Sequence, residues 1–342
     1  MKFLLAICFY FFTDNLFAQQ NEIIIVQRNL QKKEVVVTAN DKPFTTFIFP
    51  DSLEKPVLFP IYAPNENIVT RGFPIETKKD EPQDHPHHIG LWFTYENVNG
   101  LDFWNNSYAI PQKDKNKYGW IKTDSILETH NGEKGILKYS ASWKDINENI
   151  LLKEHTTFIF SATGNKRIID RITTLTAIQD VAMPDAKDGL LGLRVAHELQ
   201  LPSAETKKFT DINGIETIVK ADTIPTGNYL TSEGKQGDSA WSTKGVWCMM
   251  YGKILNDTIS IAIIDHPKNI GYPTYWHARG YGLFAANPLG QKIFSNGTNI
   301  LNYSLKKNES VTFRYRIIIA SGKNRLSVNE LNNQAKNFAD AK

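Results

Sequence analysis

The sequence predicts an all-β protein, a large antiparallel β-sandwich with a short helix at the C-terminus. Segments rich in β-branched and aromatic residues recur along the chain and are separated by turn residues. Several of these segments alternate polar with apolar residues, as in 138–143, which is the pattern of an antiparallel strand with one face in water. Helical periodicity is clear only in 327–341.

Each expected strand ends at residues that favour a turn, such as Asn131-Gly132. In chain order the expected strands are 22–26, 34–39, 45–49, 57–62, 90–95, 135–143, 150–160, 167–177, 190–201, 246–251, 258–265 and 310–320. The polar stretch 209–242 has weak strand character, and we expect an elaborated loop there. At the terminal helix, Ser327 provides a cap and Glu330 follows at capping-box spacing.

The first residues have the composition of a secretory signal peptide. Lys2 precedes the apolar run 3–12, and the small residue Ala18 follows a short polar stretch. The apolar run is about half of the ~20 residues that a membrane-spanning helix needs. The sequence therefore predicts a signal peptide at 1–18, export to the periplasm or beyond, no membrane insertion, and one β-sandwich catalytic domain over 19–342.

Charge and cysteine content narrow the class further. The net charge is +3 with the two signs well mixed, which argues against a nucleic-acid partner because such proteins carry a basic face or stripe. Removal of 1–18 would leave Cys248 as the single thiol, so no internal disulfide is possible. Stability must then come from a buried core, which a chain of this length can supply.

The richest segment for chemistry is the first histidine cluster, which we define as His85, His87 and His88. His85 and His87 are two residues apart, so an extended backbone would place both rings on one face, with His88 on the other. Such a pair could act as acid and base, and Asp84 could orient one ring. The alternative is a loop whose histidines bond backbone carbonyls. Arg71 precedes the cluster closely and could return to it.

Two later segments repeat this chemistry. Asp265 and His266 end an apolar strand, where sites tend to be built. Tyr275, His277 and Arg279 alternate and would share one face, which combines a phenol, an imidazole and a guanidinium. An arginine fork suits a carboxylate. The alternative for this segment is aromatic core packing with a structural ion pair.

Weaker candidates complete the predicted site. Arg194 and Glu198 would share a face of the expected strand 190–201. The large rings of Trp92 and Trp276 suit the apolar faces of sugars. Asn287, which follows the segment of Tyr275, His277 and Arg279, is a further substrate-binding candidate.

A divalent metal is left open as a cofactor. His85 and His87, with a later histidine or aspartate, could hold a metal, but their spacing matches no strong metal motif. A P-loop, a dinucleotide glycine fingerprint and a Gly-x-Ser-x-Gly elbow are absent from the sequence. Nucleotide-dependent and serine-hydrolase activities therefore have no support.

Several long strings resemble one bacterial family. They are DHPHHxGLWF at 84–93, VNGxDFW at 98–104, DHP at 265–267, PTYWHAR at 273–279 and GLFAANP at 282–288. These strings are similar to the family catalogued as methane oxygenase PmoA, and the resemblance covers nearly the whole chain after 1–18. It implies an exported protein encoded among polysaccharide-degradation genes, including those for algal polysaccharides such as ulvan. We expect the sandwich to resemble the supersandwich of sugar mutarotases.

The leading functional hypothesis is a dehydratase or lyase that acts on uronate-bearing oligosaccharides. Arg279, Arg71 or Arg194 would neutralise the carboxylate and acidify the neighbouring proton. A histidine of the first cluster or His277 would remove that proton, and Tyr275 or a second histidine would protonate the leaving oxygen.

Two alternatives remain open. One is a glycoside hydrolase that uses paired carboxylates. Its candidate residues are Asp84, Asp102, Glu198 and Asp265. The other is a non-catalytic carbohydrate-binding protein with an aromatic platform. Its candidate residues are Trp92, Trp104 and Trp276. The sequence does not indicate an oligomeric state.

Overall fold

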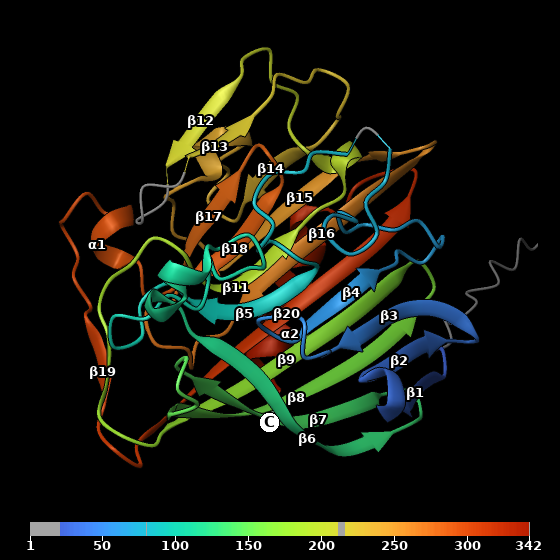
Figure 1. Cartoon of the computed structure of the whole chain (residues 1–342). Helices are drawn as coiled ribbons and strands as arrows, with labels where there is room; N and C mark the ends of the chain where they lie inside the picture. Colours follow the sequence, from blue (N-terminus) through green and yellow to red (C-terminus); the bar gives the residue numbers. More distant parts are fainter. Residues whose placement is uncertain (1–20, 80, 211–215, 342) are drawn as a thin grey trace, which may run out of the picture.

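Two large antiparallel sheets form the body of the protein (Figure 1). The computed structural model describes residues 21–79, 81–210 and 216–341. Each large sheet has eight strands, and the last helix follows the last strand. The predicted all-β antiparallel class with a short C-terminal helix is confirmed. The predicted signal peptide at 1–18 lies outside the described residues.

The first sheet has the strand order β1-β2-β3-β4-β5-β11-β18-β17. Its strands are β1 (Ile24–Asn29), β2 (Glu34–Ala39), β3 (Lys42–Ile48), β4 (Val57–Ile61), β5 (Leu91–Tyr95), β11 (Gly189–Arg194), β17 (Tyr275–Arg279) and β18 (Leu283–Asn287). Strands distant in sequence are neighbours in the half of this sheet that carries β5, β11, β18 and β17.

The second sheet has the strand order β14-β15-β16-β20-β9-β8-β7-β6. Its strands are β6 (Trp120–His130), β7 (Gly135–Lys144), β8 (Ile150–Thr163), β9 (Lys166–Ala177), β14 (Asn228–Thr231), β15 (Trp247–Ile254), β16 (Asp257–Asp265) and β20 (Ser310–Gly322). Long hairpins link β6 to β9, as the alternating pattern predicts.

Shorter elements complete the chain. The pairs β10 (Val181–Met183) with β19 (Tyr303–Leu305), and β12 (Lys207–Thr210) with β13 (Glu216–Val219), form two-stranded sheets. The helices are α1 (Gln291–Phe294) and α2 (Val328–Asp340), and the 3-10 turns are η1 (Leu30–Lys32), η2 (Gln112–Lys117), η3 (His197–Leu199) and η4 (Gly237–Ala240).

The core lies between the two sheets. In β9, buried residues alternate with partly exposed ones along the whole strand, so one face is turned inward. The ring of Phe44 in β3 meets that of Phe160 in β8 at 5.6 Å, edge to face. Within this apolar layer Arg171 is paired with Glu154 at 2.9 Å, which satisfies both buried charges.

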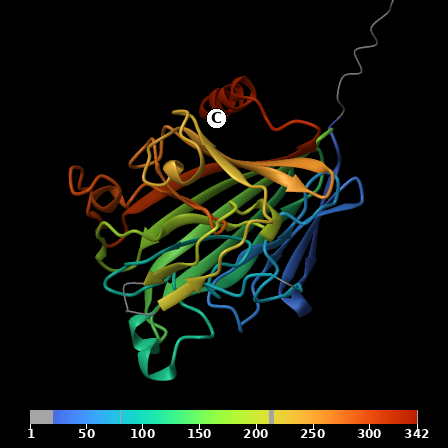
Figure 2. The ribbon, with the colours of Figure 1, turned by 90° about the horizontal axis from the view of Figure 1, so that it is seen from above.

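Helix α2 covers the outer face of the second sheet (Figure 2). Ser327 accepts a hydrogen bond from the backbone of Glu330, whose side chain accepts one from the backbone of Ser327. This is the capping box that the sequence predicts. Leu331 and Phe338 pack on apolar residues of the sheet, and this burial holds the helix in place.

Two predicted segments differ from the structure. The strand expected at 190–201 ends at Arg194. The N–H of Val195 still bonds the carbonyl of Gly282 in register with β18, but the N–H of Ala196 bonds the carbonyl of Val69, and η3 begins at His197. The prediction that Arg194 and Glu198 share a strand face is therefore wrong. The expected loop 209–242 contains β13 and β14 within its described part. Among the described helices, none is long and apolar enough to cross a bilayer.

Candidate functional site

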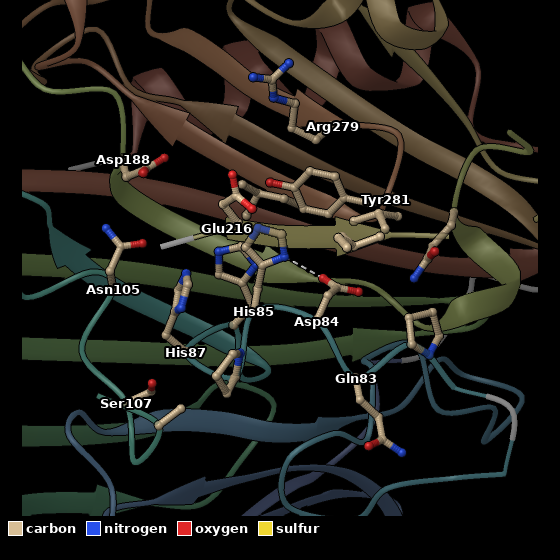
Figure 3. A pocket seen from close by; sticks show the side chains of 18 of the residues that line it. Gln83, Asp84, His85, His87, Asn105, Ser107, Asp188, Glu216, Arg279 and Tyr281 are labelled. Carbon is tan, nitrogen blue, oxygen red and sulfur yellow. Dashed lines mark hydrogen bonds and ion pairs between the residues drawn. The ribbon is translucent and has the colours of Figure 1, made fainter. Parts of the chain in front are cut away.

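A cavity of about 820 Å³ lies on the face of the first sheet that points away from the core. The alternation of β17 explains this placement, because Trp276 and Ala278 pack in the core whereas His277 and Arg279 line the cavity. The loop before β5 supplies the first histidine cluster to the same cavity. Figure 3 shows how Asp84, His85, His87, Asp188, Arg279 and Tyr281 surround it.

Arg71 holds the loop that carries the histidines. Its guanidinium is fully buried and donates to the carbonyls of Asp84 at 2.6 Å, His85 at 2.9 Å and His88 at 3.1 Å. A fixed fork that satisfies several carbonyls suits a structural clamp. At the far end of the loop Gly90 has φ +53°, and an added Cβ would lie 2.1 Å from the carbonyl oxygen of Leu58, so only glycine fits.

Asp84 is the electrostatic centre of the cluster. Both of its oxygens accept from Arg194 Nη2, at 2.8 and 2.9 Å, and Oδ1 lies 2.5 Å from His85 Nδ1. Burial alone would raise the pKa of Asp84, but Arg194, the His85 hydrogen bond and Arg71 together hold that pKa well below its usual range. Asp84 is therefore ionised at neutral pH and can only accept hydrogen bonds.

This fixes the tautomer of His85. Since the ionised Asp84 must accept, His85 Nδ1 carries the proton, and Nε2 of the neutral ring is the basic nitrogen. Burial lowers the pKa of His85, although the hydrogen bond to Asp84 opposes this shift. The backbone of His85 has φ +45°, a strained conformation that is typical of functional sites.

The rings around His85 form an offset stack. Tyr281 lies parallel to His85 at 4.8 Å, and His88 lies parallel to it at 4.8 Å. His88 in turn stacks on Trp92 at 5.2 Å and lies 3.3 Å from Arg194. Burial lowers the pKa values of His87 and His88 well below the usual value, and neighbouring positive charge adds to this effect. The whole cluster is therefore neutral at pH 7.

His277 forms a second aspartate–histidine pair in the cavity. Its Nδ1 lies 3.3 Å from Asp188 Oδ1, a close contact without hydrogen-bond alignment. Burial, followed by the charge of Arg279, lowers the pKa of His277 well below its usual value. Burial and the neighbouring Asp188 raise the pKa of Glu96, and burial raises that of Asp102 to about 7. Two carboxyls behind the wall of the cavity can thus hold protons near neutral pH.

Arg279 and Lys187 place positive charge on the cavity wall. The guanidinium of Arg279 lies over the ring of Trp241 at 4.5 Å, which orients the side chain by a cation–π contact. A partly buried arginine at a polar cavity can bind a carboxylate with two parallel hydrogen bonds.

The structure does not bring all predicted residues to this cavity. Tyr275 packs on Phe294, and its hydroxyl accepts from Asn299. Asn287 is fully buried and bonds the backbone carbonyls of Ala186 and Lys187. Neither Tyr275 nor Asn287 lines the cavity.

The tryptophans expected to bind sugar are part of the interior. Trp92 and Trp276 are fully buried, Trp92 beneath His88 and Trp276 against Phe284. Trp104 is nearly buried, although its edge reaches the cavity wall. An exposed platform of these rings, as the binding-protein hypothesis requires, is therefore not formed.

Asp265, His266 and Glu198 also lie away from the cavity. Asp265 accepts hydrogen bonds from Asn269 and from the backbone of Thr274, so it organises a turn. The ring of His266 packs edge-on against α2, and Glu198 is exposed on η3.

This placement corrects two predictions. Of the four carboxylates considered for glycoside hydrolysis, Asp84 alone lines the cavity, so this set supplies no catalytic pair. Arg71 and Arg194 do not line the cavity, because both guanidiniums are turned into the protein and engaged there.

Sequence reasoning missed Asp188, Tyr281 and Gln200, which all line the cavity. Tyr281 continues the alternation from His277 and Arg279, so the same face argument could have found it. Asp188 stands before Gly189, and such a pair by itself predicts only a turn. Gln200 has no sequence signal, since it reaches the cavity through η3.

The possibility of a metal held by His85 and His87 finds no complete donor set. Over residues 21–79, 81–210 and 216–341, no group of three or more His, Cys, Asp or Glu side chains is arranged to hold a metal ion. His85 stacks on both Tyr281 and His88, which is an arrangement of rings rather than of converging lone pairs.

Comparison with solved structures gives distant similarities. The Slr1438 protein from Synechocystis sp. PCC 6803 shares 8% identity over 90% of this chain and 98% of that chain, with a TM-score of 0.31. The GalM/aldose epimerase homologue from C. elegans shares 9% identity over 88% of this chain and 99% of that chain, with a TM-score of 0.32. The alpha-galactosidase from Lactobacillus brevis shares 9% identity over 92% of this chain and 41% of that chain, with a TM-score of 0.36. Similarity at this level assigns no activity.

The sequence itself matches one family model and no curated protein. The model is described as a family of unknown function, DUF6807, and it matches residues 34–336. The matched region includes the first histidine cluster, β17 and Tyr281.

Proposed function

This chain belongs to the DUF6807 family of unknown function, and we propose that it is a carbohydrate-active enzyme that breaks a C–O bond of a uronate-bearing oligosaccharide by elimination. One observation carries the proposal: His85, oriented by Asp84, stacks on Tyr281 in the same cavity as Arg279. This arrangement supplies a base, an acid and a carboxylate-binding group to one ligand.

His85 is the base in this reaction. Its Nε2 is unprotonated at neutral pH, because Asp84 keeps the single ring proton on Nδ1 and burial lowers the pKa of the ring. In the proposed step Nε2 takes the proton from the sugar carbon beside the carboxylate. Asp84 then stabilises the imidazolium that forms, as a fixed negative charge does in other aspartate–histidine pairs.

Tyr281 is the acid. Burial raises the pKa of its phenol well above the ordinary value, so the hydroxyl keeps its proton until a stronger base develops beside it. As the electron pair of the C–H bond forms the new double bond, the C–O bond of the neighbouring carbon breaks. The departing oxygen takes the proton of Tyr281, and later transfer from His85 to Tyr281 restores both groups.

Arg279 and Lys187 bind the sugar carboxylate. Their charges neutralise the carboxylate, which makes the neighbouring C–H more acidic and stabilises the negative charge that develops when the proton leaves. The fully buried Arg71 and Arg194 hold the base in position instead.

The test is mass spectrometry of the purified protein incubated with uronate-containing oligosaccharides. Elimination gives a product that has lost one water, or fragments whose masses sum to that of the substrate. Hydrolysis gives fragments that sum to substrate plus one water, and that result would contradict the proposal. His85→Ala should abolish the change, whereas His155→Ala, on the exposed surface of β8, should not.

The substrate class and the location of the protein belong to the same proposal. The strings shared with the family from polysaccharide-degrading bacteria support a carbohydrate substrate. The composition of 1–18 supports export to the periplasm or beyond. An oligosaccharide released outside the cytoplasm would reach such an enzyme directly.

A further inference from the structure

One wall of the cavity is formed by the strand β13. Glu216, Ile218 and Val219 of this strand all line the cavity. Ile218 is 61% exposed, which leaves apolar surface beside the ligand space. Glu216 is ion-paired with Lys208 on the neighbouring strand β12.

A second apolar surface comes from the segment that follows Trp104. Ala109 and Ile110 line the cavity, and Ile110 is nearly buried, so its position is set by packing. Polar and charged groups also line the cavity, among them His85, Asp188 and His277. The cavity is therefore lined both by polar catalytic groups and by four apolar residues that we call the outer lip, defined as Ala109, Ile110, Ile218 and Val219.

The outer lip matches the chemistry of a sugar ring. A pyranose presents C–H groups on its faces and hydroxyls at its edge. One face can therefore pack against apolar side chains while the hydroxyls at the edge stay hydrated. The cavity of about 820 Å³ is in the upper part of the range of roughly 300–1,000 Å³ for ligand pockets. This volume provides space for a second ring beside the one at His85.

We propose that the outer lip is a second sugar subsite, so that the substrate is an oligosaccharide of at least two units. The reacting uronate lies at His85, and the adjoining sugar packs against Ile218 and Ile110. This inference rests on the proposed function, because it takes the ligand of the His85 centre to be a uronate.

The test compares the binding of two probes by titration calorimetry: a free uronic acid and a uronate-containing disaccharide. The recovered ligand is weighed by mass spectrometry, so binding and turnover are measured separately. Ile218→Ser removes apolar surface from the lip. Ile224→Ser is the matched control, since Ile224 is 81% exposed in the same part of the chain but does not line the cavity.

For the wild type we expect the disaccharide to bind roughly tenfold more tightly than the free uronic acid. Ile218→Ser should remove most of this difference, and Ile224→Ser should keep it. Equal affinity for both probes, or equal behaviour of the two variants, overturns the subsite. Length-dependent binding without product supports the subsite and contradicts the elimination. Product formation without length dependence does the reverse, and absence of uronate binding overturns both.

Discussion

Replacement of Asp84 by asparagine tests how the site is held together. The carboxylate is the partner of Arg194 at 2.8 Å and lies 3.5 Å from Arg71, and both arginine side chains are fully buried. The amide of the Asp84→Asn variant would keep the shape but remove the negative charge that Arg194 and Arg71 share. Removal of one partner of a buried pair typically costs about 3–5 kcal/mol, which is a large part of the roughly 5–15 kcal/mol stability of a domain.

The same substitution should impair catalysis, because an amide no longer fixes the proton on His85 Nδ1. We expect kcat to fall by roughly 10²–10⁴-fold, the usual contribution of a positioned base. Urea unfolding measures the first effect and turnover at a temperature where the variant is folded measures the second. Glu128→Gln is the control, because its pair with Lys138 is about half exposed and should contribute little. A loss of stability below about 1 kcal/mol, or unchanged kcat, would refute the reasoning.

Four further outcomes are expected. Burial lowers the pKa of His88 in the folded state, so the contribution of the neutral ring to stability is present above pH ~6.5 and is lost as the pH falls below that value. Urea unfolding between pH 5 and 8 should show this dependence of stability on pH. His88→Gln should reduce the slope by up to about 1.4 kcal/mol per pH unit. Tyr281→Phe should retain ligand binding by calorimetry but lose turnover, and equal loss of both would contradict its role as acid. Arg279→Gln should weaken the binding of uronates much more than that of neutral sugars, and a parallel loss for both would contradict carboxylate recognition. In the described part of the chain, the buried Gln200 Nε2 has no hydrogen-bond partner, so Gln200→Met should raise the stability of the ligand-free protein by about 1 kcal/mol and weaken ligand binding. Unchanged binding would show that Gln200 does not contact the ligand.

The sequence predicts the fold class because local pattern decides it. Strands such as β9 alternate along their whole length, and the capping box of α2 is visible in Ser327 and Glu330. The end of β11 was not predictable, because the N–H of Ala196 bonds the carbonyl of Val69, which is distant in sequence. Contacts of this kind leave no periodic signal.

The sequence predicts the candidate site only in part, because local motifs are visible in it and burial is not. His85, His87, His277 and Arg279 are dense in motifs and do meet in one cavity. Most of the other predicted residues are buried away from the cavity. A sequence does not show whether a guanidinium such as that of Arg194 points into a cavity or holds a loop in place from the interior. A tryptophan or an arginine whose residue type suits ligand binding can therefore lie behind the cavity and hold the lining residues in place.

The central claim is that His85 removes a proton from the carbon beside the sugar carboxylate. The most direct measurement uses a uronate oligosaccharide deuterated at that carbon and follows the label in the product by mass spectrometry and NMR. If His85 removes that proton, the product lacks the deuterium and forms more slowly than from the unlabelled substrate. A product that retains the deuterium at that carbon would contradict the central claim.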